Sequence, residues 1–119
     1  MTVWVDDVRH AYGRMVMCHM WSDSEEELHT MADRIGVARR WIQKPPKASW
    51  LHFDICLEKK RLALAAGAIL TDRYGPVLHV ARLRGDQARI DRVLDLRLRA
   101  GKDPETGMTS GAAARLPGL

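Results

Sequence analysis

The sequence is poor in several features that would place a protein in a special class. It contains 2 cysteines among 119 residues, too few for a disulfide framework, so we expect free thiols. Its uncharged apolar runs stay far below the roughly 18–20 residues that a membrane-spanning helix needs. The N-terminus has neither a basic start nor the apolar segment of a signal peptide. These absences predict a cytoplasmic protein with no membrane partner.

Charge of either sign is also in little excess. The net charge of +4 is shared about equally between residues 1–83 and 84–119, so neither part is a basic arm. Nucleic acid is therefore permitted as a partner but not required. With 46% hydrophobic and 29% charged residues, the composition is that of an ordinary globular protein. The length allows one domain.

Strand-like and helix-like segments alternate along the chain, which predicts an α/β fold with a short mixed sheet and two packed helices. The clearest helix starts in Ser22–Glu25, where a capping box precedes apolar residues at helical spacing, and it ends at Gly36. A basic loop with two prolines, Arg39–Lys47, follows. The other expected elements are strands at 3–5, 15–21 (with a short helix as the alternative), 68–70 and 76–80, and helices at 58–67 and 86–101.

Composition divides the chain into three parts. We expect residues 1–83 to form the α/β domain with a polar site, residues 84–101 an amphipathic helix, and residues 102–119 a flexible, disordered tail. The tail is rich in Gly, Ser, Thr, Pro and Ala and has too few large apolar residues to offset chain entropy. The helix has apolar positions opposite arginines, a pattern that either docks into a partner groove or packs on the domain or a second copy.

Two short stretches, 6–19 and 52–56, concentrate titratable side chains next to strand-like segments. Such side chains at strand ends can converge on one ligand. Asp6, Asp7 and Asp54 are candidate ligands for Mg²⁺ or Mn²⁺, because hard cations prefer oxygen and such sites serve phosphoryl chemistry. In the alternative interpretation Asp7 caps a turn, and the other two acids pair with arginines.

The histidines and cysteines allow further interpretations. His19 and His52 are candidates for general acid and base, and the alternative is a core histidine bonded to a neighbouring aspartate. A zinc site with Cys18 and Cys56 is disfavoured, because the adjacent Cys18 and His19 would point to opposite faces of a strand. Both cysteines lie in apolar runs, which argues against a reactive thiolate.

Recognition of an anion without chemistry is another hypothesis. Arg9, Arg14 and the basic loop 39–47 can neutralise phosphates, while Trp41 or Trp50 can stack on a base. The alternative is that the basic side chains are solvated and the tryptophans belong to the core.

Several separated motifs occur in order: Thr2–Asp7, Gly13–Met20, Glu26–Val37, His52–Ile55 and Ala65–Ala68. Together they resemble domain-of-unknown-function family 4031, a small domain of bacteria and their phages, over about residues 2–83. That family brings no established activity.

The resemblance implies only which positions belong to the family's polar pattern. The chain departs from that pattern at Glu58, where the family has a small hydroxyl residue, and an acid there argues against phosphate binding at that helix start. The positions that match are Asp6, Asp7, Arg14, His19, His52, Asp54 and Lys59.

The sequence thus predicts a site that binds a phosphorylated ligand, such as a nucleotide or a nucleic-acid end. In the enzyme version a divalent cation on the three acids assists phosphoester hydrolysis, one of the two histidines transfers the proton, and Arg14 neutralises phosphate. In the non-catalytic version Arg14 and Lys59 contact the anion. The competing hypothesis is a phage or bacterial protein-interaction module that acts through residues 86–100, on a protein partner or as a homodimer.

Overall fold

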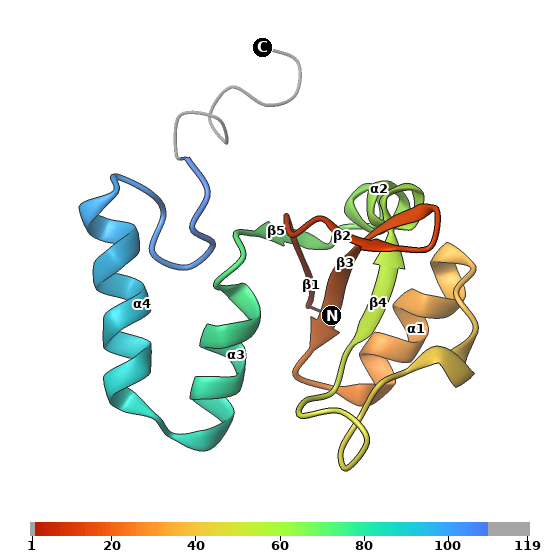
Figure 1. Cartoon of the computed structure of the whole chain (residues 1–119), viewed down its shortest axis with the longest axis horizontal. Helices are drawn as coiled ribbons and strands as arrows, with labels where there is room; N and C mark the ends of the chain where they lie inside the picture. The colour runs from red at the N-terminus through yellow and green to blue at the C-terminus, as the bar shows by residue number, and fades with distance from the viewer. Residues whose placement is uncertain (1, 110–119) are drawn as a thin grey trace. The chain divides into compact units, whose positions relative to one another are not determined.

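The computed structural model describes residues 2–109, in two compact units that divide between residues 70 and 71 (Figure 1). The first unit holds β1 (Val3–Asp6), β2 (His10–Tyr12), β3 (Met15–Ser22), α1 (Glu25–Ile35), the 3₁₀ helix η1 (Arg39–Trp41), β4 (Phe53–Cys56) and α2 (Leu57–Ala65). Strand β5 (Ile69–Thr71) lies at the boundary, and α3 (Gly75–Arg84) and α4 (Gln87–Arg99) follow. None of the helices between residues 2 and 109 is long and apolar enough to cross a membrane.

The strands form a mixed five-stranded sheet built around β3. Met17 lies opposite both His10 of β2 and Cys56 of β4, and Met20 lies opposite both Val5 of β1 and Phe53 of β4. All three pairings are antiparallel. Because β4 pairs with the same residues of β3 as β1 and β2 do, β1 and β2 share one edge of β3 and β4 occupies the other. Strand β5 joins the sheet next to β1. The predicted α/β class and short mixed sheet are confirmed.

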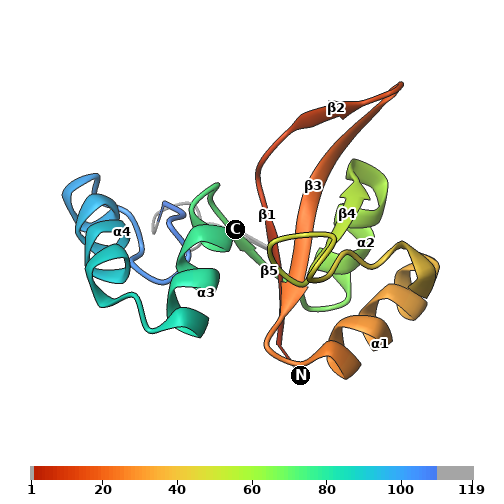
Figure 2. The ribbon, with the colours of Figure 1, turned by 60° about the horizontal axis from the view of Figure 1, so that its bottom comes forward.

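One face of the sheet carries the core of the first unit. Alternate residues of a strand point to opposite faces, and on this face the side chains are apolar and fully buried. They are Val3, Val5, Cys18, Met20, Phe53 and Ile55. Helix α1 adds Leu28, Met31, Ala32 and Ile35 to the same cluster, and Figure 2 shows α1 and α2 on the same side of β3 and β4. Helices α1 and α2 therefore pack on the core face and do not cover the opposite face of the sheet.

Helix α1 begins and ends as the sequence predicts. The Ser24 hydroxyl accepts a hydrogen bond of 3.2 Å from the Glu27 backbone N–H, and three glutamates in the first turn favour the positive end of the helix dipole. Gly36 ends the helix with a φ of 79°, a left-handed conformation that costs glycine little.

The segment after α1 is held in place at both of its ends. The Arg39 guanidinium donates to both carboxylate oxygens of Asp33 at 3.1 and 2.7 Å. Further on, the backbones of Gln43 and His52 exchange hydrogen bonds of 2.8 and 2.9 Å. These contacts hold η1 next to α1, and they hold Gln43 next to His52, the residue before β4.

The structure corrects the predicted strand at residues 76–80, which belongs to helix α3. Pro76 occupies the first turn of α3, where its missing N–H costs nothing, and Gly85 ends the helix with a φ of 67°. Leu78 and Ala81 are buried three residues apart, as helical spacing requires. Periodicity in a short apolar run cannot separate a strand from a buried helix. Helix α3 packs against α4, and the two compact units divide before α3.

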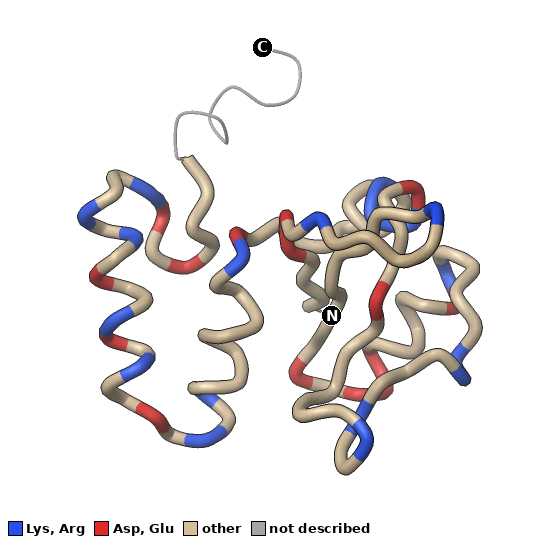
Figure 3. The backbone as a smooth tube through the Cα atoms, in the orientation of Figure 1, with Lys and Arg blue, Asp and Glu red and all other residues tan. Residues whose placement is uncertain are grey.

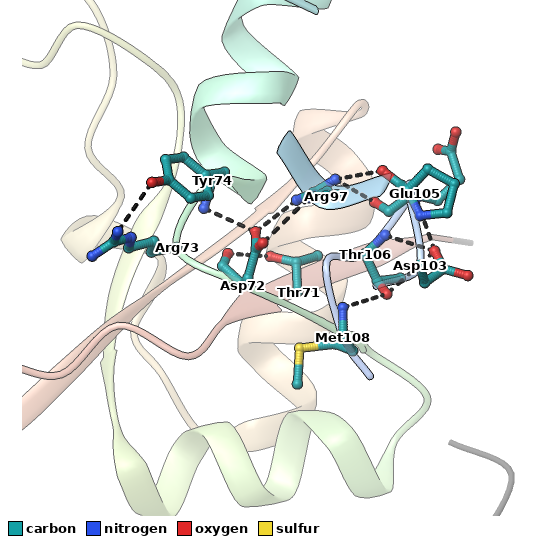
Figure 4. A network of polar contacts seen from close by, with 10 residues as sticks. Thr71, Asp72, Arg73, Tyr74, Arg97, Asp103, Glu105, Thr106 and Met108 are labelled. Carbon is teal, nitrogen blue, oxygen red and sulfur yellow. Dashed lines mark hydrogen bonds and ion pairs between the residues drawn. The ribbon is translucent and has the colours of Figure 1, made fainter. Parts of the chain in front are cut away.

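The second unit is organised by a buried arginine. Arg97 is 1% exposed and forms two hydrogen bonds to the Asp72 carboxylate, at 2.7 and 3.3 Å. Its remaining terminal nitrogen donates to the backbone carbonyls of Pro104 and Glu105 at 2.8 and 3.1 Å (Figure 4). A buried guanidinium is tolerated when its donors are satisfied in this way. Arg97 therefore joins α4 to the segment before α3 and to the turn after α4.

Residues 102–109, which the sequence assigned to a disordered tail, form a turn closed by a bridge between Lys102 and Thr109. Asp103 accepts hydrogen bonds from the backbone N–H groups of Glu105 and Thr106 at 2.8 and 3.0 Å. Gly107 has a φ of 73°, and a Cβ at this position would collide with the Asp72 carboxylate. The rest of the predicted tail, 110–119, lies outside the described residues.

The Arg97 network predicts a large stability effect in the full chain. Arg97→Ala leaves the Asp72 carboxylate and two carbonyls without their partner, and removing one member of a buried ion pair costs roughly 3–5 kcal/mol. Circular dichroism during urea unfolding measures the loss of α3 and α4. The matched control is Arg99→Ala on the same helix, because Arg99 is 82% exposed and forms a surface ion pair with Asp95. Equal stability of the two variants would contradict this role for Arg97.

Candidate metal centre

The face of the sheet opposite the core gathers polar side chains from all three strand pairs. His19 of β3 lies directly opposite Asp54 of β4, so both side chains project from the same face. Asp6 follows Val5, which pairs with Met20, so Asp6 lies beside His19 on the other edge of β3. His10 lies opposite Met17, two residues from His19 and on the same face. Strand register thus places His10, His19 and Asp54 together.

Asp6 fixes the orientation of His19. Asp6 is 0% exposed, and one of its oxygens accepts from the backbone N–H groups of His19 and Val8 at 3.0 and 3.3 Å. Its other oxygen lies 2.7 Å from His19 Nδ1. A carboxylate accepts, so Nδ1 carries the proton and Nε2 of the neutral ring offers its lone pair. This hydrogen bond raises the pKa of His19 above its usual value, against the opposing effect of burial.

His10, His19 and Asp54 offer ligand atoms that all lie within 4.8 Å of one another. The rings of His10 and His19 are stacked with their centroids 5.3 Å apart, and His19 Nε2 lies 3.8 Å from Asp54 Oδ1. Within residues 2–109, His10 Nε2 and Asp54 Oδ1 are buried and form no hydrogen bond, although Oδ1 lies 3.3 Å from His52 Nε2. Buried polar atoms without a hydrogen bond are costly, and a cation would satisfy the carboxylate oxygen and an unprotonated ring nitrogen.

Asp54 is held by further polar contacts. Its Oδ2 accepts a hydrogen bond of 2.6 Å from the Gln43 amide, and its Oδ1 lies 3.3 Å from His52 Nε2. These contacts lower the pKa of Asp54, with His52 as the largest cause, then Gln43, while partial burial opposes them. The carboxylate is therefore ionised and available as a ligand at neutral pH.

His52 is the other histidine that contacts Asp54. His52 Nδ1 lies 3.0 Å from the Trp50 carbonyl, which can only accept, so Nδ1 carries a proton. Nε2 donates to Asp54 Oδ1 only in the ring that carries both protons, and the lowering of the Asp54 pKa by His52 belongs to that form. His52 is thus a neighbour of His19 and Asp54.

The donor set is suited to a divalent transition metal. Two imidazole nitrogens and one carboxylate leave a coordination position open, as in catalytic zinc sites and in two-His, one-carboxylate iron sites. Bonds of roughly 2.1 Å would place tetrahedral ligand atoms about 3.4 Å apart. The His19–Asp54 distance of 3.8 Å is close to this value, and all three ligand atoms lie within 4.8 Å of one another.

A pocket of about 420 Å³ opens next to these residues. His10, Gln43 and Asp54 form its polar part, and Tyr12, Met15, Met17, Val37 and Trp41 line the rest. Tyr12 and Trp41 are large aromatic residues that remain 68% and 61% exposed. The candidate metal centre therefore lies at the wall of a mainly apolar pocket.

The residues predicted from the sequence are distributed differently from the expectation. Asp6 supports His19, and Asp7 follows the end of β1 as an exposed residue. Arg9 and Arg14 are exposed on either side of β2. The Lys59 side chain lies near the end of α1, because a Cβ added at Gly36 would be 3.2 Å from its Nζ. Among residues 2–109, the set His10, His19 and Asp54 is the group with metal-ligand geometry. The three predicted acids do not form such a group.

The sequence prediction assigns no role to His10, although this residue lies in the first polar stretch. The signal that identifies it is the short segment His10–Ala11–Tyr12, followed by a turn at Gly13 and by the next strand. That pattern predicts a hairpin, and the hairpin register places His10 on the face of His19.

Cys18 projects into the core and away from His19. It is 0% exposed, and burial is the main cause that raises the pKa of its thiol to about 12. Such a thiol is not a nucleophile at neutral pH, and its place on the core face keeps it away from the candidate ligands. The adjacent residues Cys18 and His19 thus belong to opposite faces, as strand geometry requires.

The buried Asp6 carboxylate predicts a large stability effect. Asp6→Ala removes the partner of His19 Nδ1 and of two backbone N–H groups, and we expect a loss of about 3 kcal/mol. Asp6→Asn retains one acceptor oxygen, so we expect a smaller loss. Urea unfolding followed by tryptophan fluorescence measures both. The neighbouring Asp7→Ala is the control, and an equally small effect at Asp6 would rule out this role.

Comparison with known proteins places the chain in a family. Residues 3–83 match a family model described as "Protein of unknown function (DUF4031)". Neither curated proteins nor solved structures gave a match. The matched segment exceeds half of the chain and contains His10, His19 and Asp54 together with Asp6. The chain therefore belongs to the DUF4031 family, as its sequence motifs indicate.

Proposed function

We propose that His10, His19 and Asp54 hold a divalent transition metal, and that the centre assists hydrolysis of a phosphoester. One observation supports the proposal: three ligand atoms converge within 4.8 Å, and two buried atoms of this group, His10 Nε2 and Asp54 Oδ1, form no hydrogen bond within residues 2–109, although His52 Nε2 lies 3.3 Å from Oδ1. The Asp6–His19 hydrogen bond adds the outer carboxylate that usually accompanies a metal-bound histidine.

The ligand chemistry favours certain metals. Imidazole nitrogen suits Zn²⁺ and Fe²⁺, whereas Mg²⁺ prefers oxygen ligands and keeps several waters. With two nitrogens and one carboxylate oxygen, the centre favours Zn²⁺, Fe²⁺ or Mn²⁺ over Mg²⁺. When bound, such a metal polarises a phosphoryl oxygen and lowers the pKa of a bound water.

The surrounding residues support hydrolysis in distinct ways. Asp6 keeps the His19 ring in the tautomer that directs Nε2 at the centre. Gln43 orients the Asp54 carboxylate through its 2.6 Å hydrogen bond. His52, 3.3 Å from Asp54, is placed to take up or release a proton. Arg14 lies in the turn between β2 and β3, next in sequence to pocket residue Met15, and its exposed guanidinium is a candidate contact for an anionic group.

Metal titration of the full chain tests the proposal. We expect Co²⁺ and Zn²⁺ to bind at one site per chain, and His10→Gln to weaken binding at least tenfold, because a ligand is lost without disturbing the core. Isothermal titration calorimetry and the visible absorption of bound Co²⁺ measure this. Chelator-sensitive hydrolysis of bis(p-nitrophenyl) phosphate by the loaded protein tests the chemical step.

The matched control for His10→Gln is His29→Gln. His29 lies on α1 and faces Glu25 and Phe53, away from the candidate ligands. Unchanged affinity in His10→Gln, or an equal loss in His29→Gln, would refute the metal centre. Metal binding without any hydrolysis would leave a binding protein and reject the enzyme.

A second candidate function, protein interaction through the second unit, is favoured by its exposed leucines. Leu83 of α3 and Leu98 of α4 are 65% and 60% exposed, although Val93 of α4 is buried. Figure 3 shows acidic and basic residues interspersed along α4, a pattern that permits pairing with a second copy. We propose self-association as the form of this interaction.

Light scattering after size-exclusion chromatography tests the self-association. We expect the mass of the wild-type chain to rise towards that of a dimer with concentration, and the double variant Leu83→Lys and Leu98→Lys to remain monomeric. Val16→Lys, at a 37% exposed position of the first unit, is the control. A wild-type chain that stays monomeric at every concentration would reject this candidate.

A further inference from the structure

We infer that the pocket beside His10 and Asp54 binds a flat aromatic or heteroaromatic ring of the ligand, between Tyr12 and Trp41. This inference rests on the proposed function and adds the class of substrate: an aryl or nucleobase-like group that carries a metal-binding group of at most one negative charge.

The lining of the pocket is mainly apolar and aromatic. Five of its lining residues are apolar or aromatic: Tyr12, Met15, Met17, Val37 and Trp41. Tyr12, Met15 and Trp41 are 68%, 47% and 61% exposed, so they present a contiguous apolar surface that water covers unfavourably. Thioethers and aromatic rings pack well against flat π systems. Such a surface next to candidate ligands indicates a ring-binding wall.

The wall is held in position before any ligand binds. Trp41 ends the short helix η1, which Arg39 ties to Asp33, and Arg40 lies 5.1 Å over the Trp41 ring. Tyr12 is paired with Met15 across the β2–β3 hairpin. Binding costs less entropy when the backbone segments that carry the contacting side chains are already ordered. The two aromatic residues come from separate elements and line one pocket, as expected for a formed binding site.

Charge decides which reacting group fits. No lysine or arginine is among the described residues that line the pocket. A divalent cation on Asp54, with Asp6 behind His19, gives a local sum near zero when both acids are ionised. A dianionic phosphate monoester would therefore find little net attraction, whereas a monoanionic diester or a neutral ester avoids that repulsion. Arg40, which lies 5.1 Å over the Trp41 ring, adds one positive charge beside the pocket and suits a single negative charge on the ligand.

Size limits the ring. A volume of about 420 Å³ lies near the lower end of small-molecule pockets, roughly 300–1,000 Å³. One or two fused rings with a short substituent fill this space. A longer polymer would have to extend past the exposed edge at Tyr12.

Methionine-methyl nuclear magnetic resonance of the full chain tests the inference. Of the 6 methionines, Met15 and Met17 line the pocket, while Met20 and Met31 are buried in the core and serve as internal controls. The probes are benzohydroxamate and acetohydroxamate, which share a metal-binding group and differ by the ring. With zinc-loaded protein, we expect benzohydroxamate alone to give ring-current shifts at Met15 and Met17, and to bind about tenfold more tightly.

Variants of the wall complete the test. Tyr12→Ala and Trp41→Ala should each remove most of the advantage of benzohydroxamate and leave zinc affinity unchanged. Val16 lies on the same hairpin, between Met15 and Met17 in the sequence, so Val16→Ala should retain the tighter binding of benzohydroxamate. Equal affinities for the two probes, or shifts at Met20 and Met31 instead of Met15 and Met17, would overturn the inference.

The same titration separates the two proposals. Zinc binding without a ring preference would reject the ring pocket and retain the metal centre. If zinc does not bind, the metal centre fails, and the ring pocket is judged on the metal-free protein. There, benzohydroxamate must still shift Met15 and Met17 in a way that Tyr12→Ala removes. The absence of such shifts in both states would reject the ring pocket as well.

Discussion

The hydrogen bond between Asp6 and His19 is the contact on which the polar face of the first unit depends. Asp6 is fully buried at the end of β1, so its carboxylate must be paired to be tolerated there. It meets this need by accepting from the His19 backbone and from His19 Nδ1. The same contact joins β1 to β3 beyond the last paired residues and directs His19 Nε2 towards Asp54. One interaction therefore stabilises the sheet edge and prepares the candidate centre.

The two faces of β3 carry different side chains: one face contributes to the core, and the other contributes to the candidate metal centre. Cys18 and Met20 project into the core, while Met17 and His19 project into the polar face. Because side chains alternate along a strand, the packing of α1 and α2 on one face fixes the strand register, and that register aligns the donors on the other. Substitutions on the core face would therefore act on the centre indirectly, through the register that places His19 opposite Asp54.

Local signals in the sequence predicted the elements that have strong caps and periodicity, and failed where long-range contacts decide. The Ser24 cap, the apolar spacing and Gly36 define α1 without help from the rest of the chain. By contrast, the apolar run at 76–80 suits either a strand or a helix, and its packing against α4 selects the helix. Arg97 reads as one more surface arginine of an amphipathic helix, yet the turn after α4 buries it against Asp72.

By itself, the sequence determined that the chain is an α/β protein of the DUF4031 family, with Asp, His and Arg residues grouped near strand ends. Only the tertiary structure decided which of these residues meet. Asp7 is one residue from Asp6 but lies outside the polar cluster, whereas His10 comes from a separate strand and joins it. The physical reason is that strand pairing and side-chain alternation set spatial neighbours, and both depend on contacts between residues that are distant along the chain.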